Sequence, residues 1–104
     1  MIGVWVTFRY GDHFDEQALR NIAEAARPKF AGMPRLHSKV FTIHSARREA
    51  INFYIWHSED AARIFFTDAL LERVTSLYGV RPSIEFVEIA VMVEGGAAMK
   101  EPGG

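Results

Sequence analysis

The sequence predicts an α+β fold in which strands and helices follow the order βαββαβ. Four segments are rich in β-branched and aromatic residues, and two others carry apolar residues at helical spacing. The chain has 104 residues, a length that allows one domain. Hydrophobic residues make up 49% of it and charged residues 24%, which excludes a disordered or low-complexity chain.

The first strand and the first helix occupy the N-terminal third of the chain. Residues 2–10 predict a strand, because β-branched and aromatic side chains dominate them. Residues 15–27 predict a helix with one apolar stripe, capped by Asp12 or Asp15. Pro28 is expected to end this helix, because proline disfavours helical backbone in the residue before it.

The middle of the chain predicts a hairpin and a long second helix. Residues 36–44 and 50–57 are strand-like, and the polar loop 45–49 joins them. The second helix is predicted over residues 59–78. Thr67 is a good helix cap, so the helix is expected to kink or break there.

The C-terminal part of the chain predicts one more strand and a tail. Residues 83–93 form a long strand-like segment, and the Gly-, Ala- and Pro-rich residues 95–104 predict a flexible tail. The domain therefore spans residues 1–94. Right-handed crossovers would give a ferredoxin-like antiparallel sheet with strand order 4-1-3-2 and both helices on one face.

Strand alternation predicts which side chains leave the helix-covered face of this sheet. The side chains expected toward the helices are Val4, Val6, Phe8, Ile51, Phe53, Ile55, Val87, Ile89, Val91 and Val93. Those expected on the helix-free face are Trp5, Thr7, Arg9, His37, Lys39, Phe41, Asn52, Tyr54, Trp56, Phe86, Glu88 and Ala90. An exposed face with so many aromatic rings is unusual for a monomer. We therefore expect a homodimer that packs these faces together. Each subunit would enclose a partly apolar cavity, either between the helices and the sheet or between the two sheets; the alternative is a dimer core without a ligand.

The charge balance and residue content exclude several function classes. The formal net charge is −1, so no basic excess exists to neutralise nucleic-acid phosphates. There is no cysteine, which excludes disulfides and thiolate chemistry. No apolar run approaches the roughly 20 residues that span a bilayer, and the N-terminus lacks signal-peptide features. We expect a cytoplasmic protein that binds neither nucleic acid nor membrane.

The sequence also lacks the common cofactor motifs. No Gly-rich phosphate loop follows a strand, no nucleophile elbow is present, and the four histidines lack metal-ligand spacing. We therefore expect no bound cofactor and no metal.

Several short motifs resemble the dimeric α+β barrel superfamily. Residues 56–61, Trp-His-Ser-Glu-Asp-Ala, are similar to the Trp-x-Ser-x-x-Ala junction of its antibiotic-biosynthesis monooxygenases. The pattern of residues 39–42, Tyr54 and residues 77–80 is similar to the small YdhR-type monooxygenase group. The resemblance covers most of residues 1–94. It implies an enzyme that oxidises phenolic or anthrone-like aromatics with molecular oxygen and no bound cofactor, because the substrate anion itself supplies the electrons.

This resemblance implies roles for polar residues near a pocket. Asn52 and Tyr54 are candidates to stabilise a substrate anion, with a satisfied strand amide and plain packing as the alternatives. Arg9 is a third candidate, unless it pairs with Glu88 across strands. His37 is a candidate base near neutral pH, or else an exposed edge residue.

Aromatic and small polar side chains would hold a flat ring. The candidate substrate-binding residues are Trp5, Thr7, Phe41, Trp56, Phe65 and Phe86. The leading hypothesis is a cofactor-independent monooxygenase acting on a small aromatic or polyketide-type substrate. The alternatives are a non-catalytic, ligand-binding or stress-responsive barrel, and a cyclase or isomerase that uses the same pocket.

Overall fold

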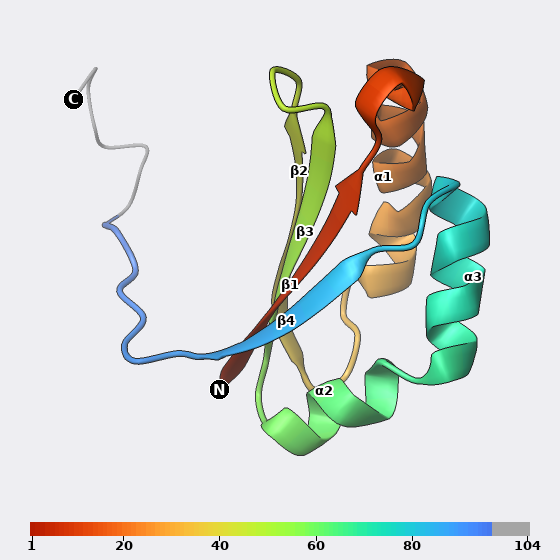
Figure 1. Ribbon diagram of the computed structural model, residues 1–104. Helices are drawn as coiled ribbons and strands as arrows, with labels where there is room; N and C mark the ends of the chain where they lie inside the picture. Colours follow the sequence, from red (N-terminus) through yellow and green to blue (C-terminus); the bar gives the residue numbers. More distant parts are fainter. Residues whose placement is uncertain (97–104) are drawn as a thin grey trace.

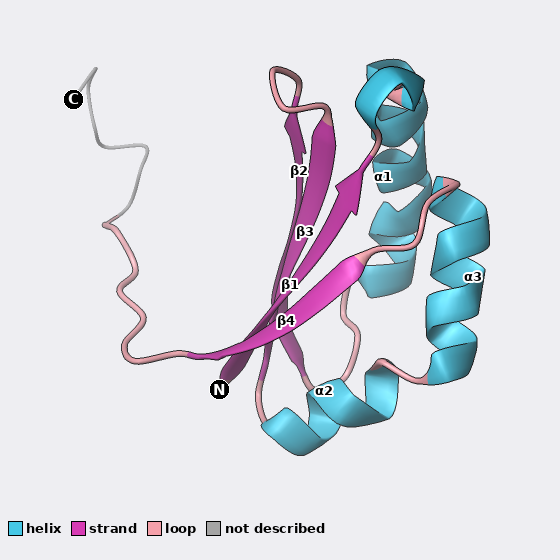
Figure 2. Ribbon diagram, viewed as in Figure 1, coloured by secondary structure: helices cyan, strands magenta, loops and turns pink. Residues whose placement is uncertain are grey.

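The computed structural model describes residues 1–96 and shows one four-stranded sheet with helices on one of its faces (Figures 1 and 2). The elements are β1 (Ile2–Arg9), the 3-10 turn η1 (Gly11–His13), α1 (Glu16–Phe30), β2 (Leu36–His44), β3 (Glu49–Trp56), α2 (Glu59–Phe65), α3 (Asp68–Tyr78) and β4 (Ser83–Glu88). All neighbouring strands are antiparallel, in the order β2-β3-β1-β4. The predicted fold class and strand order are confirmed. None of the helices in residues 1–96 is long and apolar enough to cross a membrane.

The second predicted helix is divided at Thr67, where a break was expected. The Thr67 hydroxyl accepts a hydrogen bond from the backbone N–H of Leu70, at 3.1 Å, and caps α3. Ser58 caps α2 in the same way through the N–H of Ala61, also at 3.1 Å. Gly79 ends α3 with a φ of 84°, a left-handed conformation that glycine adopts without steric strain. The two helices therefore begin and end where their capping residues stand.

The first helix continues through Pro28 to Phe30, so the predicted end at Arg27 is wrong. Because Pro28 has no backbone N–H, the helix lacks a single hydrogen bond, the one that residue 28 would donate to the carbonyl of Glu24. Glu24 is exposed, so water can satisfy that carbonyl, and the N–H of Ala31 closes the last turn on the carbonyl of Arg27 at 3.1 Å. The extra residues carry the Phe30 side chain to the edge of the sheet.

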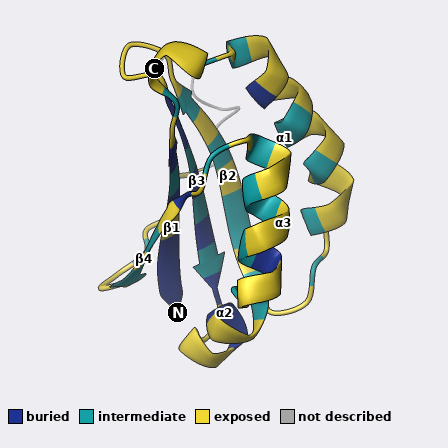
Figure 3. Ribbon diagram, turned by 45° about the vertical axis from the view of Figure 1, so that its right-hand side comes forward, coloured by how far each residue is buried: buried dark blue, intermediate teal, exposed yellow. Residues whose placement is uncertain are grey.

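The core lies between the helices and the central strand β1. Val4 and Phe8 are fully buried and Val6 is nearly so, as predicted for side chains that face the helices. The ring of Phe8 stacks on that of Tyr78 of α3, with centroids 3.8 Å apart and planes 9° apart. Figure 3 shows the contrast between this buried strand and the largely exposed surface of α1.

The predicted orientation of β3 is wrong. Paired residues of antiparallel strands point to the same face, and Val6 pairs with Asn52 while Val4 pairs with Tyr54. Asn52, Tyr54 and Trp56 therefore face the helices, and Ile51, Phe53 and Ile55 face the open side. Both sets of β3 side chains are largely apolar, so their alternation does not indicate which set is buried.

The outer strands differ from the prediction for the same reason. Phe86 pairs with Val4, and Lys39 and Phe41 pair with Tyr54 and Asn52, so all three face the helices. Val87, by contrast, lies on the open face opposite Gly3.

The last strand is shorter than predicted. Glu88 pairs with Ile2, the first residue of β1, so only Met1 remains beyond it on that strand's side. The strand ends there, and the chain runs away from the sheet (Figure 1). Val91 and Val93 are 77% and 83% exposed, so the prediction that they face the helices is wrong. The predicted tail, residues 95–104, lies mostly outside the described residues.

The open face of the sheet is apolar, although its residues differ from the predicted set. Trp5 packs on Phe53 with centroids 4.2 Å apart, and Val40 is 51% exposed. A Cβ at Gly3 would lie 2.9 Å from a ring carbon of Phe53, so glycine makes room for this ring. The other apolar members of the face are Ile51, Ile55 and Val87.

Candidate functional site

The helix α1 stands away from the sheet and leaves open space beneath it. Only Leu19 of this helix is buried. A groove of about 920 Å³ runs between α1 and β2, and a smaller cavity of about 70 Å³ lies deeper between the sheet and the helices. Four residues line both spaces, namely Phe30, Lys39, Asn52 and Tyr78. The groove therefore leads to the cavity, and the pair has the size of a small-molecule site.

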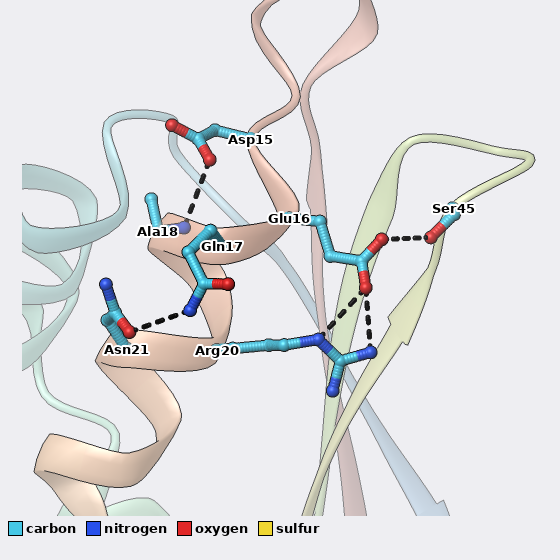
Figure 4. A network of polar contacts seen from close by, with 7 residues as sticks. All are labelled: Asp15, Glu16, Gln17, Ala18, Arg20, Asn21 and Ser45. Carbon is cyan, nitrogen blue, oxygen red and sulfur yellow. Dashed lines mark hydrogen bonds and ion pairs between the residues drawn. The ribbon is translucent and has the colours of Figure 1, made fainter.

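A polar network fixes the N-terminal end of α1 to the β2–β3 hairpin (Figure 4). The Glu16 carboxylate accepts hydrogen bonds from Ser45 of the hairpin, at 2.9 Å, and from the Arg20 guanidinium, at 2.7 and 2.9 Å. These bonds lower the pKa of Glu16. Asp15 caps the helix through the N–H of Ala18. This end of α1 is thus held while the groove opens alongside the helix.

Aromatic side chains form the walls of the cavity. The Tyr54 ring lies 5.9 Å from Phe30, 5.8 Å from Phe65 and 5.0 Å from Phe66, measured between centroids. These rings come from α1, β3 and the end of α2. They provide flat apolar surfaces that suit an aromatic ligand and exclude water.

A buried amide–phenol pair lies at the boundary between groove and cavity. The Asn52 side-chain nitrogen donates a hydrogen bond to the Tyr78 hydroxyl at 3.0 Å, and Asn52 is 3% exposed. The Tyr78 hydroxyl proton remains available for another acceptor. Burial raises the pKa of both Tyr54 and Tyr78, so both phenols are neutral hydrogen-bond donors at neutral pH.

The position of Tyr78 is fixed from its backbone side. The Tyr10 hydroxyl donates to the Tyr78 carbonyl at 2.9 Å and so holds the end of α3 against the sheet. Burial raises the pKa of Tyr10 to about 12, which keeps this donor protonated.

One amine points into the same space. The Lys39 Nζ lies 3.5, 4.2 and 4.3 Å from the ring centres of Phe30, Phe41 and Tyr54. Burial is the main cause that lowers its pKa to about 7, and the nearby charge of Lys29 adds to the effect. A lysine in this state exchanges a proton near neutral pH.

The structure separates the predicted site residues into two groups on opposite faces of the sheet. Those on the helix side are Phe41, Asn52, Tyr54, Trp56, Phe65 and Phe86, of which Phe41, Asn52, Tyr54 and Phe65 line the groove or the cavity. Those on the open face are Trp5, Thr7 and Arg9, which therefore lie across the sheet from the cavity. The predicted place on the helix-free face is wrong for five of them, namely Phe41, Asn52, Tyr54, Trp56 and Phe86, and right for Trp5, Thr7 and Arg9. Phe65 lies on α2, within the helix predicted over residues 59–78.

Two further predicted residues have specific partners. Arg9 lies 3.4 Å from the Glu49 carboxylate and donates to the Ser83 hydroxyl at 3.0 Å. It does not pair with Glu88, because Glu88 stands at the other end of β1. His37 is exposed at the edge of the groove, beside the irregular start of β2.

Sequence reasoning missed three residues of this site, namely Phe30, Lys39 and Tyr78. Phe30 and Tyr78 lie at helix ends, where the sequence pattern says little about which way a side chain points. Lys39 is flanked by strand residues, and a lysine is mostly exposed in such positions. Its one available signal was the resemblance of residues 39–42 to monooxygenase sequences.

Within residues 1–96, no three histidine or acidic side chains lie close enough together to hold a metal ion. The Trp56 indole N–H is buried and has no hydrogen-bond partner among the described residues. It stands beside Phe65, with ring centroids 4.9 Å apart, behind the aromatic wall.

The chain shares its fold with solved structures of monooxygenases. A Bordetella bronchiseptica protein described as an antibiotic biosynthesis monooxygenase superposes with a TM-score of 0.65 and 16% identity, over 86% of this chain and 97% of that one. A Deinococcus radiodurans protein of the same description gives a TM-score of 0.62 and 13% identity, over 93% of this chain and 100% of that one. The ActVA-Orf6 monooxygenase of Streptomyces coelicolor, in complex with nanaomycin D, superposes with a TM-score of 0.62 and 18% identity, over 90% of this chain and 92% of that one.

No protein-family model and no curated protein matches the chain in sequence. The resemblance to monooxygenases predicted from the short motifs is therefore confirmed at the level of the fold.

Proposed function

We propose that the chain is a cofactor-independent monooxygenase whose substrate is a small aromatic or polyketide-type molecule. The observation that carries the proposal is the buried Asn52–Tyr78 pair at the junction of an open groove and an aromatic cavity. The shared fold supports it, because one of the similar structures is a monooxygenase with a small molecule bound. The substrate would enter through the groove and place its ring among Tyr54, Phe65 and Phe30.

The proposed reaction balances without an external reductant. An activated methylene group between two aromatic rings loses two hydrogens and gains one oxygen atom as a carbonyl. Molecular oxygen supplies that atom, and its second atom leaves as water with the two hydrogens. The four electrons that reduce oxygen come from the substrate, so its anion must form first.

The protein's task is to favour that anion and keep water away. The Asn52 amide and the hydroxyls of Tyr54 and Tyr78 are donors in a site walled by rings, where a hydrogen bond to an anion is stronger than in water. Arg9 has no part in this proposal, because it lies on the far face of the sheet. His37 stands at the mouth of the groove, where it would contact the outer part of the substrate.

We also propose that two copies associate through the open face of the sheet. Trp5, Phe53 and Val40 leave an apolar surface there that water would otherwise cover. The segment after Glu88, with Val91 and Val93 exposed, continues the alternation of a strand and would pair with the second copy. Light scattering should give a dimer mass for the wild-type chain and a monomer mass for Trp5→Glu.

The oxidation is tested by oxygen uptake with a panel of anthrones and hydroquinones. We expect turnover by the wild type and a loss of about tenfold or more in kcat for Asn52→Ala, because a donor to the anion is removed. Glu72→Gln is the matched control, since Glu72 is exposed on α3 and lines neither the groove nor the cavity. Its rate should equal that of the wild type.

The outcomes separate this proposal from its alternatives. Binding of the same aromatics without oxygen uptake would favour a non-catalytic ligand-binding protein. Conversion of the substrate without oxygen uptake would favour a cyclase or isomerase. Equal rates for Asn52→Ala and the wild type would show that the buried pair is not part of the reacting site.

A further inference from the structure

Lys39 occupies the one position from which a side chain of β2 reaches both the groove and the aromatic cavity. It lines both spaces, and its Nζ is within 4.3 Å of three ring centres. These rings belong to α1, β2 and β3, so the amine is enclosed on several sides. The same enclosure removes most of the water that would otherwise solvate an ammonium group.

The surroundings of Lys39 contain no carboxylate that is free to pair with it. Among the described residues that line the groove and cavity, the only carboxylate is that of Glu24, which forms an ion pair with Arg27 at 3.0 Å. The titratable and charged groups that line these spaces are Arg20, Glu24, Arg27 and Lys29 of α1, His37 of β2, Tyr54 of β3 and Tyr78 of α3. Positive charge therefore prevails, and a ligand must bring the negative charge.

Two effects compete at the amine. The ring faces attract the cation by about 0.5–2 kcal/mol. Loss of water disfavours it by several kcal/mol, and Lys29 repels it. Desolvation is the larger effect, so the pKa of Lys39 lies well below its ordinary value. An empty site leaves much of this amine uncharged at neutral pH and able to accept a proton.

We propose that Lys39 is the base of this site and that its substrates are weakly acidic phenols or enols. The O–H bond of the substrate breaks, its proton goes to Nζ, and the electron pair stays on the oxygen. The ammonium and the phenolate form together, so each charge gains its partner inside the cavity. The neutral hydroxyls of Tyr54 and Tyr78 are then available to donate to the phenolate oxygen. The role of Lys39 as a catalytic base rests on the proposed function. Its role in binding acidic phenols does not depend on that function.

The binding experiment uses para-nitrophenol, whose phenolate and phenol forms have different visible spectra. We expect the wild-type protein to bind it as the phenolate, at a pH where most of the free compound is still protonated. Lys39→Met removes the amine while keeping an unbranched side chain that extends as far as Cε. We expect it to lose about 10- to 100-fold in affinity for the phenolate, since a hydrogen bond to a charged group is removed.

A second variant separates a titrating amine from a fixed positive charge. In the wild type, affinity for the phenolate should fall as the pH rises through about 7, because the amine loses its proton. Lys39→Arg keeps a charge that does not titrate, so its affinity should stay level over the same range. Glu72→Gln should bind like the wild type. Circular dichroism establishes that each variant is folded.

Two results would overturn the assignment. One is a wild-type complex with the spectrum of the neutral phenol, and the other is Lys39→Met binding the phenolate as tightly as the wild type does. The assay does not depend on turnover. If Lys39 binds the phenolate but no oxygen is taken up, the proposed oxidation is wrong and the phenolate site stands. If Lys39→Met still turns over substrate, the proposed oxidation stands and Lys39 is not its base.

Discussion

The buried amine of Lys39 should make the stability of this protein depend on pH. Its pKa falls from 10.5 to about 7 on folding. At about 1.4 kcal/mol for each pKa unit, that fall corresponds to about 5 kcal/mol. This figure is the net cost of keeping the amine charged in the folded protein, because the pKa already reflects the attraction of the rings as well as the loss of water. The charged lysine therefore destabilises the folded state wherever it stays protonated.

The sign of the effect follows from proton binding. Between about pH 7 and pH 10.5 the unfolded lysine holds a proton that the folded one has released. The free energy of unfolding must then rise with pH across this window. Below about pH 7 both states are protonated, and the full cost of burying the ammonium is present.

Chemical denaturation of the wild type and of Lys39→Met, over a series of pH values, measures this effect. We expect Lys39→Met to be more stable than the wild type by about 5 kcal/mol below about pH 7, with the difference disappearing toward pH 10.5. Arg73→Met is the matched control, because Arg73 is exposed on α3 and lines neither the groove nor the cavity, so its removal should change stability by less than about 0.5 kcal/mol. A Lys39→Met protein that is less stable than the wild type at low pH would refute the reasoning, since the rings would then stabilise the cation more than burial disfavours it.

Substitutions at three further positions test the packing by denaturant titration. Tyr78→Phe should cost about 1–3 kcal/mol, because the buried Asn52 amide loses its acceptor; no loss would mean that water replaces the hydroxyl. Gly3→Ala should cost about 1–3 kcal/mol, because its Cβ would meet the Phe53 ring at 2.9 Å; unchanged stability would show that the ring moves aside freely. Thr67→Ala should cost about 1 kcal/mol and Thr67→Ser much less, since serine keeps the capping oxygen.

The sequence by itself determined the elements and their order. Local signals are sufficient for this, because a capping residue such as Thr67 acts on the backbone N–H three residues ahead of it. The strand order then followed from the handedness of the crossovers. The apolar character of the open face was also predicted from the sequence, because β1 alternates clearly between Val4, Val6 and Phe8 on one side and Trp5 on the other.

Only the tertiary structure decided where the site lies. In β3 both faces carry large apolar side chains, so a shift of one residue changes nothing in the local pattern but moves Asn52 and Tyr54 across the sheet. Pairing with β1 fixes that choice, and pairing is a contact between segments far apart in the chain. The pairing of β2 with β3 sets Lys39 opposite Tyr54 and so turns it inward, and the continuation of α1 to Phe30 places a ring over its amine. The pKa of a lysine depends on such surroundings and therefore cannot be predicted from its neighbours in sequence.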